Sequence, residues 1–151
     1  MPETYILDSC VFNRLLDKRV CLSDISSNGV FVATLVQRGE LEATKDEARS
    51  DQLLATFKQV SRRIDPTETF CFDISHLDFD KWGDGQLFTK LKATLDAKNG
   101  GAKIGAEYPK LNNARDALIA EVAIVQGFTL VTADRDLAEV AEEHGAKTFL
   151  V

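Results

Sequence analysis

The chain has no long apolar run and few cysteines. Its hydrophobic stretches fall far short of the roughly 20 residues that cross a bilayer, and Glu3 and Asp8 interrupt any signal-like opening segment. The three cysteines form no CxxC pair, a pattern typical of buried thiols in a reducing compartment rather than of a disulfide framework. The sequence therefore predicts a cytoplasmic protein without a membrane segment or structural disulfides.

Histidine is also scarce, and acidic residues outnumber basic ones. The two histidines form no HExxH motif and have no cysteine pair nearby, which argues against a zinc site. The net charge of −6 argues against a uniformly basic nucleic-acid binder. It leaves open a nucleic-acid enzyme whose acidic residues cluster around metal ions.

The length and hydrophobic content of the chain predict one domain. It has 151 residues, 44% of them hydrophobic, which is enough for a single domain over residues 1–151.

Short apolar runs alternate with segments of helical spacing. The runs predict buried strands at residues 5–7, 29–32, 70–72, 128–131 and 148–150. The segments of helical spacing begin near residues 11, 34, 44, 83, 112 and 134. Alternation of this kind requires crossover connections. It predicts a three-layer α/β/α fold with a mostly parallel central sheet of four to five strands.

Two helix starts are predicted from capping residues. Thr44 and Glu47 have the spacing of a capping box, in which both side chains bond to free amides at a helix start. Asn112 or Asn113 can cap the later helix, which would place Asp116 in its first turn.

Four acidic residues fall where a parallel sheet gathers functional groups. Asp8 directly follows the first strand, and Asp134 closely follows the strand at 128–131. Asp116 is expected near a helix start, and Glu40 in the helix after the second strand. Functional groups of open parallel sheets collect beyond the carboxyl ends of the strands, so all four could face one crevice. A helix dipole alone also favours an acid in the first turn of a helix. The prediction of a shared site therefore depends on all four acids having suitable positions, and not on any one of them.

Clustered carboxylates predict a metal site. They repel one another and stay ionised only when a cation balances them. Ligand sets made only of oxygen suit hard ions such as Mg²⁺ or Mn²⁺. Such ions activate water and neutralise charge that develops on a phosphodiester. The pattern therefore points to metal-assisted phosphoryl hydrolysis.

Three segments resemble the PIN-domain family. Residues 5–12 resemble its opening strand and first acid, and residues 113–120 resemble the helix with its third acid. Residues 130–137 resemble its Thr-x-Asp turn with the fourth acid. The resemblance spans nearly the whole chain and is closest to VapC-type toxins of toxin–antitoxin systems.

This resemblance implies a PIN-like fold and an endoribonuclease, a hydrolase that depends on Mg²⁺ or Mn²⁺. Water would attack phosphorus in line and leave 5′-phosphate and 3′-hydroxyl ends. The protein would be the toxin of a type II pair, often a homodimer, with RNA as substrate and an antitoxin as partner. The implied catalytic and metal-binding residues are Asp8, Asp116 and Asp134, and we expect Glu40 to be the fourth such acid.

The second acid departs from the family pattern. VapC-type proteins commonly show Thr-x-x-Glu after the second strand, whereas Thr34 is followed here by Gln37. Glu40 lies one helical turn later on the same face and could take the role. Glu42 and Glu47 are alternatives, although the capping box explains Glu47 better. If no acid reaches the site, the chain would be a non-catalytic or weakly active PIN-like binding protein.

Three further residues are expected to support the acids. Ser9 and Thr132 could hydrogen-bond to metal ligands or to metal-bound water, or could simply cap strand ends. Asp136 could assist the ligands, or could be the ordinary N-terminal acid of the last helix.

A local excess of positive charge precedes Asp116. Residues 90–115 contain six basic residues and two acidic ones. Such a run is usually a solvated face. The alternative is a strip that holds RNA phosphates beside the metal, with Lys103, Lys110 and Arg115 as the binding residues.

Overall fold

The structure is a computed structural model that describes residues 2–71, 74–99 and 109–151, without the side chains of 109–111. Its centre is an all-parallel sheet of five strands, in the order β3-β2-β1-β4-β5. The strands are β1 (Thr4–Leu7), β2 (Val30–Ala33), β3 (Arg63–Ile64), β4 (Thr129–Thr132) and β5 (Lys147–Leu150). The predicted parallel α/β architecture is confirmed.

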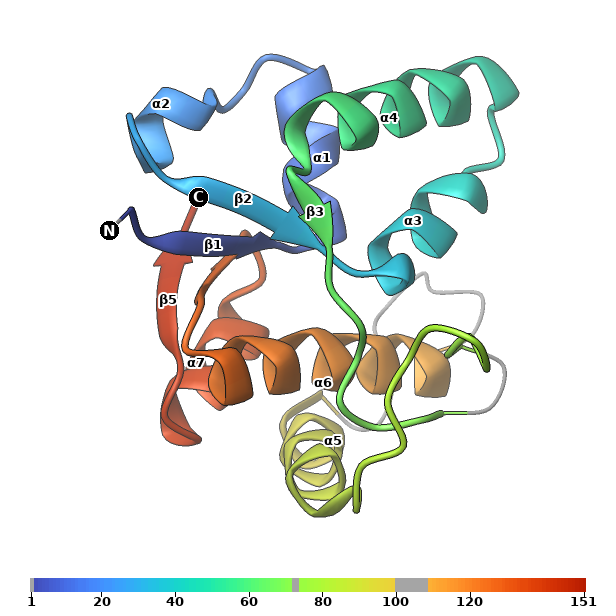
Figure 1. The fold of residues 1–151 in the computed structure, drawn as a ribbon, viewed down its shortest axis with the longest axis vertical. Coiled ribbons are helices and arrows are strands. Elements are labelled where there is room, and N and C mark those ends of the chain that lie inside the picture. Colours follow the sequence, from blue (N-terminus) through green and yellow to red (C-terminus); the bar gives the residue numbers. More distant parts are fainter. Residues whose placement is uncertain (1, 72–73, 100–108) are drawn as a thin grey trace.

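Helices cover both faces of this sheet. They are α1 (Ser9–Leu16), α2 (Leu22–Ile25), α3 (Leu35–Glu42), α4 (Glu47–Val60), α5 (Gln86–Asn99), α6 (Pro109–Gln126) and α7 (Arg135–Glu143). Helices α1, α3 and α4 lie on one side of the sheet, and α5, α6 and α7 lie on the other (Figure 1). None of the helices in the described ranges is both long and apolar enough to span a membrane.

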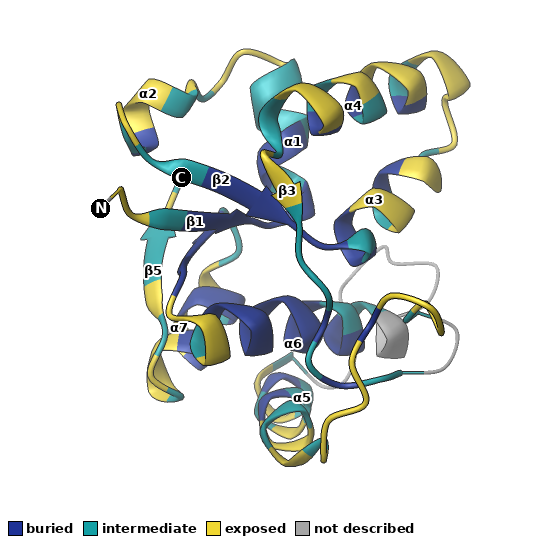
Figure 2. Ribbon diagram, in the orientation of Figure 1, coloured by how far each residue is buried: buried dark blue, intermediate teal, exposed yellow. Residues whose placement is uncertain are grey.

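Side chains of the central strands alternate between two buried clusters. Ile6 of β1 packs in the cluster that contains α6, whereas Leu7 packs in the cluster of α1 and α4. Leu130 and Val131 of β4 divide in the same way. The middle of the sheet and the inner side of α6 are buried (Figure 2). A strand with both faces buried needs a continuous apolar run, which is why β1 and β4 were detectable in the sequence.

Strands β1 and β4 are neighbours and end together. Leu7 is paired with Val131 in the parallel register. The amide of Asp8 then donates to the carbonyl of Val131 at 2.9 Å. Side chains that directly follow these two strands are therefore brought to the same edge of the sheet, beside α3 and α6.

The third strand lies elsewhere than predicted. It is Arg63–Ile64, a short strand paired with β2, and residues 70 and 71 are in irregular structure. Phe70 stacks on Trp82, with ring centroids 4.0 Å apart, while Phe72 lies outside the described residues. The apolar run at 70–72 was misleading because an irregular segment can also carry aromatic side chains, here Phe70, which is half-buried. The true strand has too few apolar residues to be detected.

Both predicted helix caps were wrong. The cap of α4 is Asp46, whose side chain accepts from the amide of Arg49, and Thr44 lies before the helix. Helix α6 begins at Pro109, a residue whose fixed φ and missing amide hydrogen suit a first helical position. Asp116 therefore lies about two turns into α6 instead of in its first turn.

Asparagines 112 and 113 lie inside α6. Asn113 is buried, and its side-chain amide donates to Asp96 at 2.7 Å and to Asn99 at 2.9 Å. These bonds join α6 to the end of α5. Asn113, which the sequence analysis interpreted as a possible helix cap, therefore makes tertiary hydrogen bonds instead.

The segment between β3 and α5 is anchored by a buried carboxylate on α6. Glu121 is 3% exposed, and its Oε2 accepts from the Thr69 hydroxyl and from the Phe88 amide, both at 3.1 Å. Its Oε1 is buried and accepts no hydrogen bond from the described residues. Burial, together with the nearby charges of Glu68 and Asp84, raises the pKa of the Glu121 carboxyl above its ordinary value of 4.5.

We expect Glu121→Gln to remove one component of the pH dependence of stability. Because the raised pKa makes the folded chain bind a proton more tightly than the unfolded chain, this component of stability is lost as pH rises from about 4.5 through the folded pKa. The amide oxygen can still accept both bonds. We measure the free energy of unfolding of both proteins by urea titration from pH 4 to 8. The value for the variant minus the value for wild type should increase as pH rises. A flat difference, or the same trend in Asp51→Asn on the exposed face of α4, would contradict this.

All three cysteines are free thiols. Cys10 and Cys71 are half-buried, whereas Cys21 is exposed. The expectation of buried thiols was therefore wrong for Cys21, which lies just before α2.

Candidate functional site

Four acidic side chains from four segments line one pocket of about 310 Å³, which we call the acid pocket. Among the residues that the structure describes, its lining is Asp8, Ser9, Cys10, Glu40, Asp116, Ala133 and Asp134. None of these residues is basic. The structure therefore brings together all four of the acids that the sequence analysis singled out.

Asp8 connects β1 to α1 and is held from both sides. It is 5% exposed. Its Oδ1 accepts from the amide of Ser9 at 2.8 Å, as the N-cap of α1. Its Oδ2 accepts from the Thr132 hydroxyl at 2.8 Å and from the Cys10 thiol at 3.3 Å. With three donors, the carboxylate has a fixed orientation at the carboxyl end of the sheet.

Asp134 has the equivalent place after β4. It is the N-cap of α7, and its Oδ1 accepts from the amides of Asp136 and Leu137 at 3.0 and 3.3 Å. Its own amide donates to the Thr132 hydroxyl oxygen at 3.0 Å. Thr132 thus links the backbone of Asp134 to the carboxylate of Asp8. The Thr132 hydroxyl makes both contacts that the sequence analysis left open, a hydrogen bond to an acid and a local bond at the strand end.

Helices α6 and α3 supply the other two acids. Asp116 is 4% exposed on a helix packed against the sheet. Glu40 lies in the last turn and a half of α3 and is half-buried. Because α3 follows β2 while α6 lies on the opposite face of the sheet, their side chains reach the pocket from different layers (Figure 1).

Gln37 has a structural role that explains why it is not an acid. It is fully buried, and its Oε1 accepts from the amide of Thr34 at 2.9 Å, completing the capping box of α3. Its Nε2 donates to the carbonyl of Leu7 at 2.9 Å. Only an amide offers both an acceptor and a donor here, since a glutamate cannot donate when ionised.

The alternative second acids lie away from the pocket. Glu42 is exposed and forms an ion pair with Arg38 at 3.1 Å, one turn earlier on α3. Glu47 is exposed in the first turn of α4. Of the three candidates, only Glu40 lines the acid pocket.

The supporting residues occupy different surroundings. Ser9 lines the acid pocket, is 8% exposed, and its Oγ makes no hydrogen bond within the described part of the chain. A buried hydroxyl without a partner is costly unless a ligand or water completes it. Asp136 lies in the first turn of α7 and does not line the pocket.

The sequence analysis missed Cys10 as a member of the site. Its thiol donates to Asp8 and lies 3.8 Å from the Thr132 hydroxyl, and its sulfur accepts from the amide of Ala133 at 3.4 Å. Burial and the adjacent Asp8 raise the pKa of the Cys10 thiol to about 12. The thiol is therefore protonated at neutral pH. The sequence feature that could have indicated this role is the position of Cys10, two residues after the acid that ends the first strand.

The proposed basic strip is only partly described. Lys103 lies outside the described residues, and the side chain of Lys110 is not described. Arg115 is half-buried and donates to Asn112 at 3.4 Å. Two other lysines of this region are engaged by carboxylates, Lys92 with Asp96 and Lys98 with Glu139.

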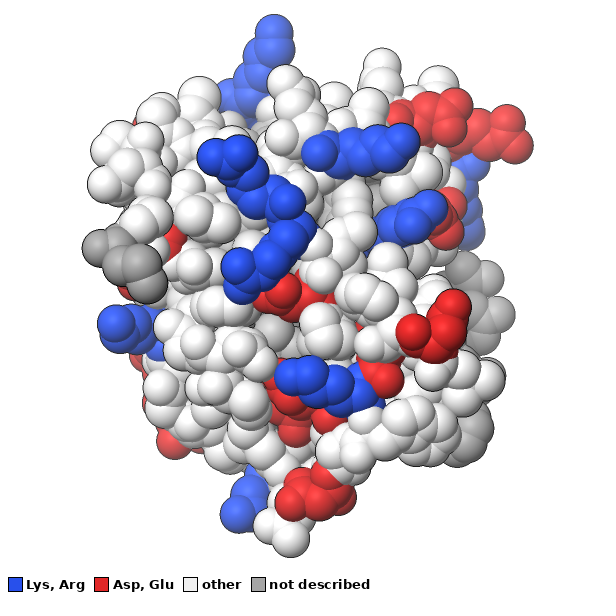
Figure 3. Space-filling view, viewed as in Figure 1, with Lys and Arg blue, Asp and Glu red and all other residues white. Residues whose placement is uncertain are grey.

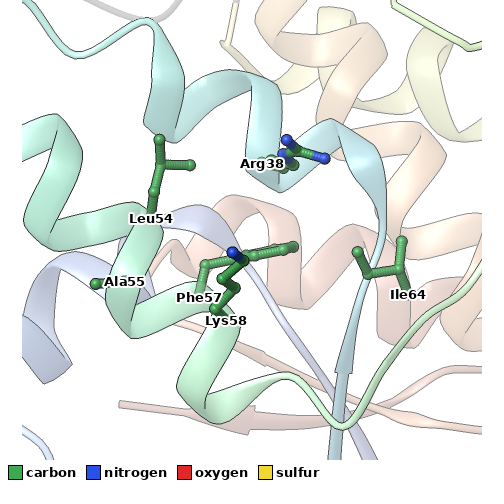
Figure 4. Close-up of a pocket in the computed structure, with 6 residues that line it drawn as sticks. All are labelled: Arg38, Leu54, Ala55, Phe57, Lys58 and Ile64. Atoms are coloured by element: carbon green, nitrogen blue, oxygen red, sulfur yellow. The ribbon is translucent and has the colours of Figure 1, made fainter.

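A larger hollow, of about 400 Å³, lies between α3, α4 and β3 (Figure 4). It is lined by Arg38, Leu54, Ala55, Phe57, Lys58 and Ile64. Lysine and arginine side chains spread over this part of the surface (Figure 3). None of these described lining residues carries a carboxylate, the ligand that metal-assisted hydrolysis needs. The candidate chemistry therefore lies in the smaller acid pocket.

A parallel sheet between two helical layers, with its strands in this order, is a PIN-like fold. The PIN domain family model matches residues 85–143, a region that contains Asp116 and Asp134. Together with the fold, this match confirms the predicted resemblance to the PIN-domain family.

Solved structures share this fold along their whole length. One is VapBC2 from Rickettsia felis bound to a DNA fragment from their promoter, with 16% identity, a TM-score of 0.53, and coverage of 98% of each chain. Another is a domain of a functionally unknown protein from Methanocaldococcus jannaschii, with 13% identity, a TM-score of 0.54, and coverage of 99% of this chain and 91% of that one. No curated protein matches the chain in sequence.

Proposed function

We propose that this chain is a metal-dependent endoribonuclease that hydrolyses RNA phosphodiester bonds and acts as the toxin of a type II toxin–antitoxin pair. The observation that carries the proposal is the acid pocket, where carboxylates from four separate segments of the chain line one cavity. PIN domains are generally nucleases, and the match to that family supports the reaction class.

The residues of the acid pocket fit a hard divalent cation. Asp8, Glu40, Asp116 and Asp134 offer carboxylate oxygens, the ligands that Mg²⁺ and Mn²⁺ prefer. The Oγ of Ser9, which makes no hydrogen bond to the residues that the structure describes, adds a hydroxyl that a metal-bound water could satisfy. Among the described residues, no three His, Cys, Asp or Glu side chains already form a metal-binding group. We therefore expect Asp116 and Glu40 to move toward Asp8 and Asp134 when a cation binds.

The four acids would have different roles in metal binding, which depend on how firmly each is held. Asp8 is held in one orientation by three donors and Asp134 by two, so they are the preorganised ligands. Asp116 and Glu40 would complete the set from opposite layers. A bound Mg²⁺ or Mn²⁺ would activate water and balance the charge that develops on the phosphodiester. Ser9 and Thr132 would orient ligands, and Asp136 would support the start of α7.

We also propose a protein antitoxin as partner, a homodimeric toxin and a cytoplasmic location, where RNA is available. The support for the antitoxin is the structural likeness to VapBC2 of Rickettsia felis. An inhibitor would need only one arginine or lysine to pair with the carboxylates of the acid pocket.

A cleavage assay tests the proposed function. Purified protein incubated with single-stranded RNA should produce discrete fragments with Mg²⁺ or Mn²⁺ and none with EDTA, and end analysis should show 5′-phosphates. If the protein binds Mn²⁺ and RNA but cuts no RNA in a diverse pool, the non-catalytic PIN-like binding protein is the correct alternative.

The basic residues before Asp116 give a prediction about substrate binding. Replacing Lys103 and Lys110 by glutamine should weaken RNA binding and flatten its dependence on salt, because each lost phosphate contact lowers the slope of log K against log salt by about 0.7. Mn²⁺ affinity should be unchanged.

The matched control changes Lys92 and Lys98 to glutamine, since it removes the same charge from lysines already paired with Asp96 and Glu139. Filter binding of RNA at several salt concentrations measures all three proteins. Equal slopes for both double variants would show that the strip is only a solvated face.

A further inference from the structure

Cys10 occupies a place in the acid pocket that neither the family pattern nor the charge of the site explains. It is the second residue of α1, directly after the Asp8–Ser9 turn, and its side chain lines the pocket. Three groups lie around its sulfur: the carboxylate of Asp8, the amide of Ala133 and the hydroxyl of Thr132.

These contacts join two turns that are more than 120 residues apart in the chain. Cys10 accepts from the Ala133 amide at 3.4 Å and donates to Asp8 Oδ2 at 3.3 Å. Thr132 forms the parallel connection, because it accepts from the Asp134 amide at 3.0 Å and donates to the same oxygen at 2.8 Å. Two short hydrogen-bonded paths therefore link the Asp8 carboxylate to the turn that carries Asp134.

We propose that Cys10 is a positioning residue of the acid pocket, which holds Asp8 against the turn at 132–134 and thereby sets the affinity for a divalent cation. A thiol suits this role because it is a weak donor. It orients the carboxylate while leaving most of the negative charge available to a ligand.

This inference rests on the proposed function, since it assumes that Asp8 binds the cation. Residues that orient metal ligands from behind typically change affinity by 10- to 100-fold when they are removed. Cys10→Ala removes the donor, and we expect the dissociation constant for Mn²⁺ to rise about 10-fold. Cys10→Ser keeps a donor and an acceptor, and should restore the affinity to within about 3-fold of wild type.

Mn²⁺ binding is measured by electron paramagnetic resonance on the RNA-free protein, so that the result does not depend on cleavage. Thermal unfolding without metal reports any change in the fold. Cys71→Ala is the matched control, because Cys71 is also half-buried but does not line the pocket. It should leave Mn²⁺ affinity unchanged even if it lowers stability.

The outcomes separate this inference from the proposed function. If wild type binds no Mn²⁺, the metal site itself is wrong. If wild type binds and Cys10→Ala binds equally well, or Cys10→Ser is as weak as Cys10→Ala, the positioning role is wrong while the metal site stands. If Cd²⁺ binds far more tightly than Mn²⁺ to wild type, and only this preference is lost in Cys10→Ser, the sulfur is itself a ligand and the positioning role is overturned.

Discussion

Replacing Asp116 by asparagine should abolish metal-dependent RNA cleavage and leave the protein folded. The substitution removes a negative charge from the acid pocket but changes the volume of the side chain very little. Loss of one preorganised electrostatic contact commonly costs a factor of about 10² to 10³ in rate, so we expect a decrease of at least that size. Because the volume of the side chain is kept, we expect the variant to remain folded without metal.

The thermal unfolding temperature in the presence of Mn²⁺ distinguishes loss of ligand binding from loss of fold. A cation that binds only the folded chain stabilises it by mass action, so wild type should gain stability with increasing Mn²⁺. Asp116→Asn should gain much less.

The matched control for Asp116→Asn is Glu121→Gln. It also neutralises a buried acid on α6, but this acid contacts Thr69 and the amide of Phe88 and does not line the pocket. It should keep full cleavage activity and the full response to Mn²⁺. Unchanged cleavage by Asp116→Asn would remove this residue from the site.

The second large effect is expected at Gln37, where restoring the family's acid should damage the protein. In Gln37→Glu, the Leu7 carbonyl loses its donor and faces a buried carboxylate oxygen instead of an N–H. An unsatisfied buried acceptor costs about 1 to 3 kcal/mol, and an uncompensated buried charge adds to that cost. We therefore expect the free energy of unfolding to fall by about 3 kcal/mol at pH 7, with no gain in Mn²⁺ affinity.

Glu40→Gln is the reciprocal experiment. It should lower Mn²⁺ affinity at least 10-fold through the lost ligand charge, and should change stability little in the absence of metal. Urea unfolding and Mn²⁺ titration of both variants give a direct comparison. If Gln37→Glu is stable and binds Mn²⁺ more tightly than wild type, Gln37 marks the second-acid position and the assignment to Glu40 is wrong.

The sequence determined the architecture because its signals are local. β1 and β4 are buried on both faces, and only continuous apolar runs satisfy such positions. Asp8 and Asp134 cap helices at the ends of these strands, so the order strand, acid, helix is legible without any distant contact. The PIN-like fold and two of the four pocket acids follow from such local patterns.

Contacts between distant segments determined the rest. A glutamine one turn before Glu40 looks like a missing acid until its bond to the Leu7 carbonyl, 30 residues away, is seen. Asn113 looks like a helix cap until it is found bonded to α5, and this error misplaced Asp116 within α6.

The role of Cys10 could not be predicted from the sequence, because it also depends on contacts between distant segments. Its partners Thr132 and Ala133 become neighbours only because β1 and β4 pair in parallel and end together. The sequence alone determined which acids end the strands, because that depends on residues adjacent in the chain. Only the tertiary structure decided which side chains share the pocket and hold those acids in place, because hydrogen bonds between distant segments depend on strand register and helix packing.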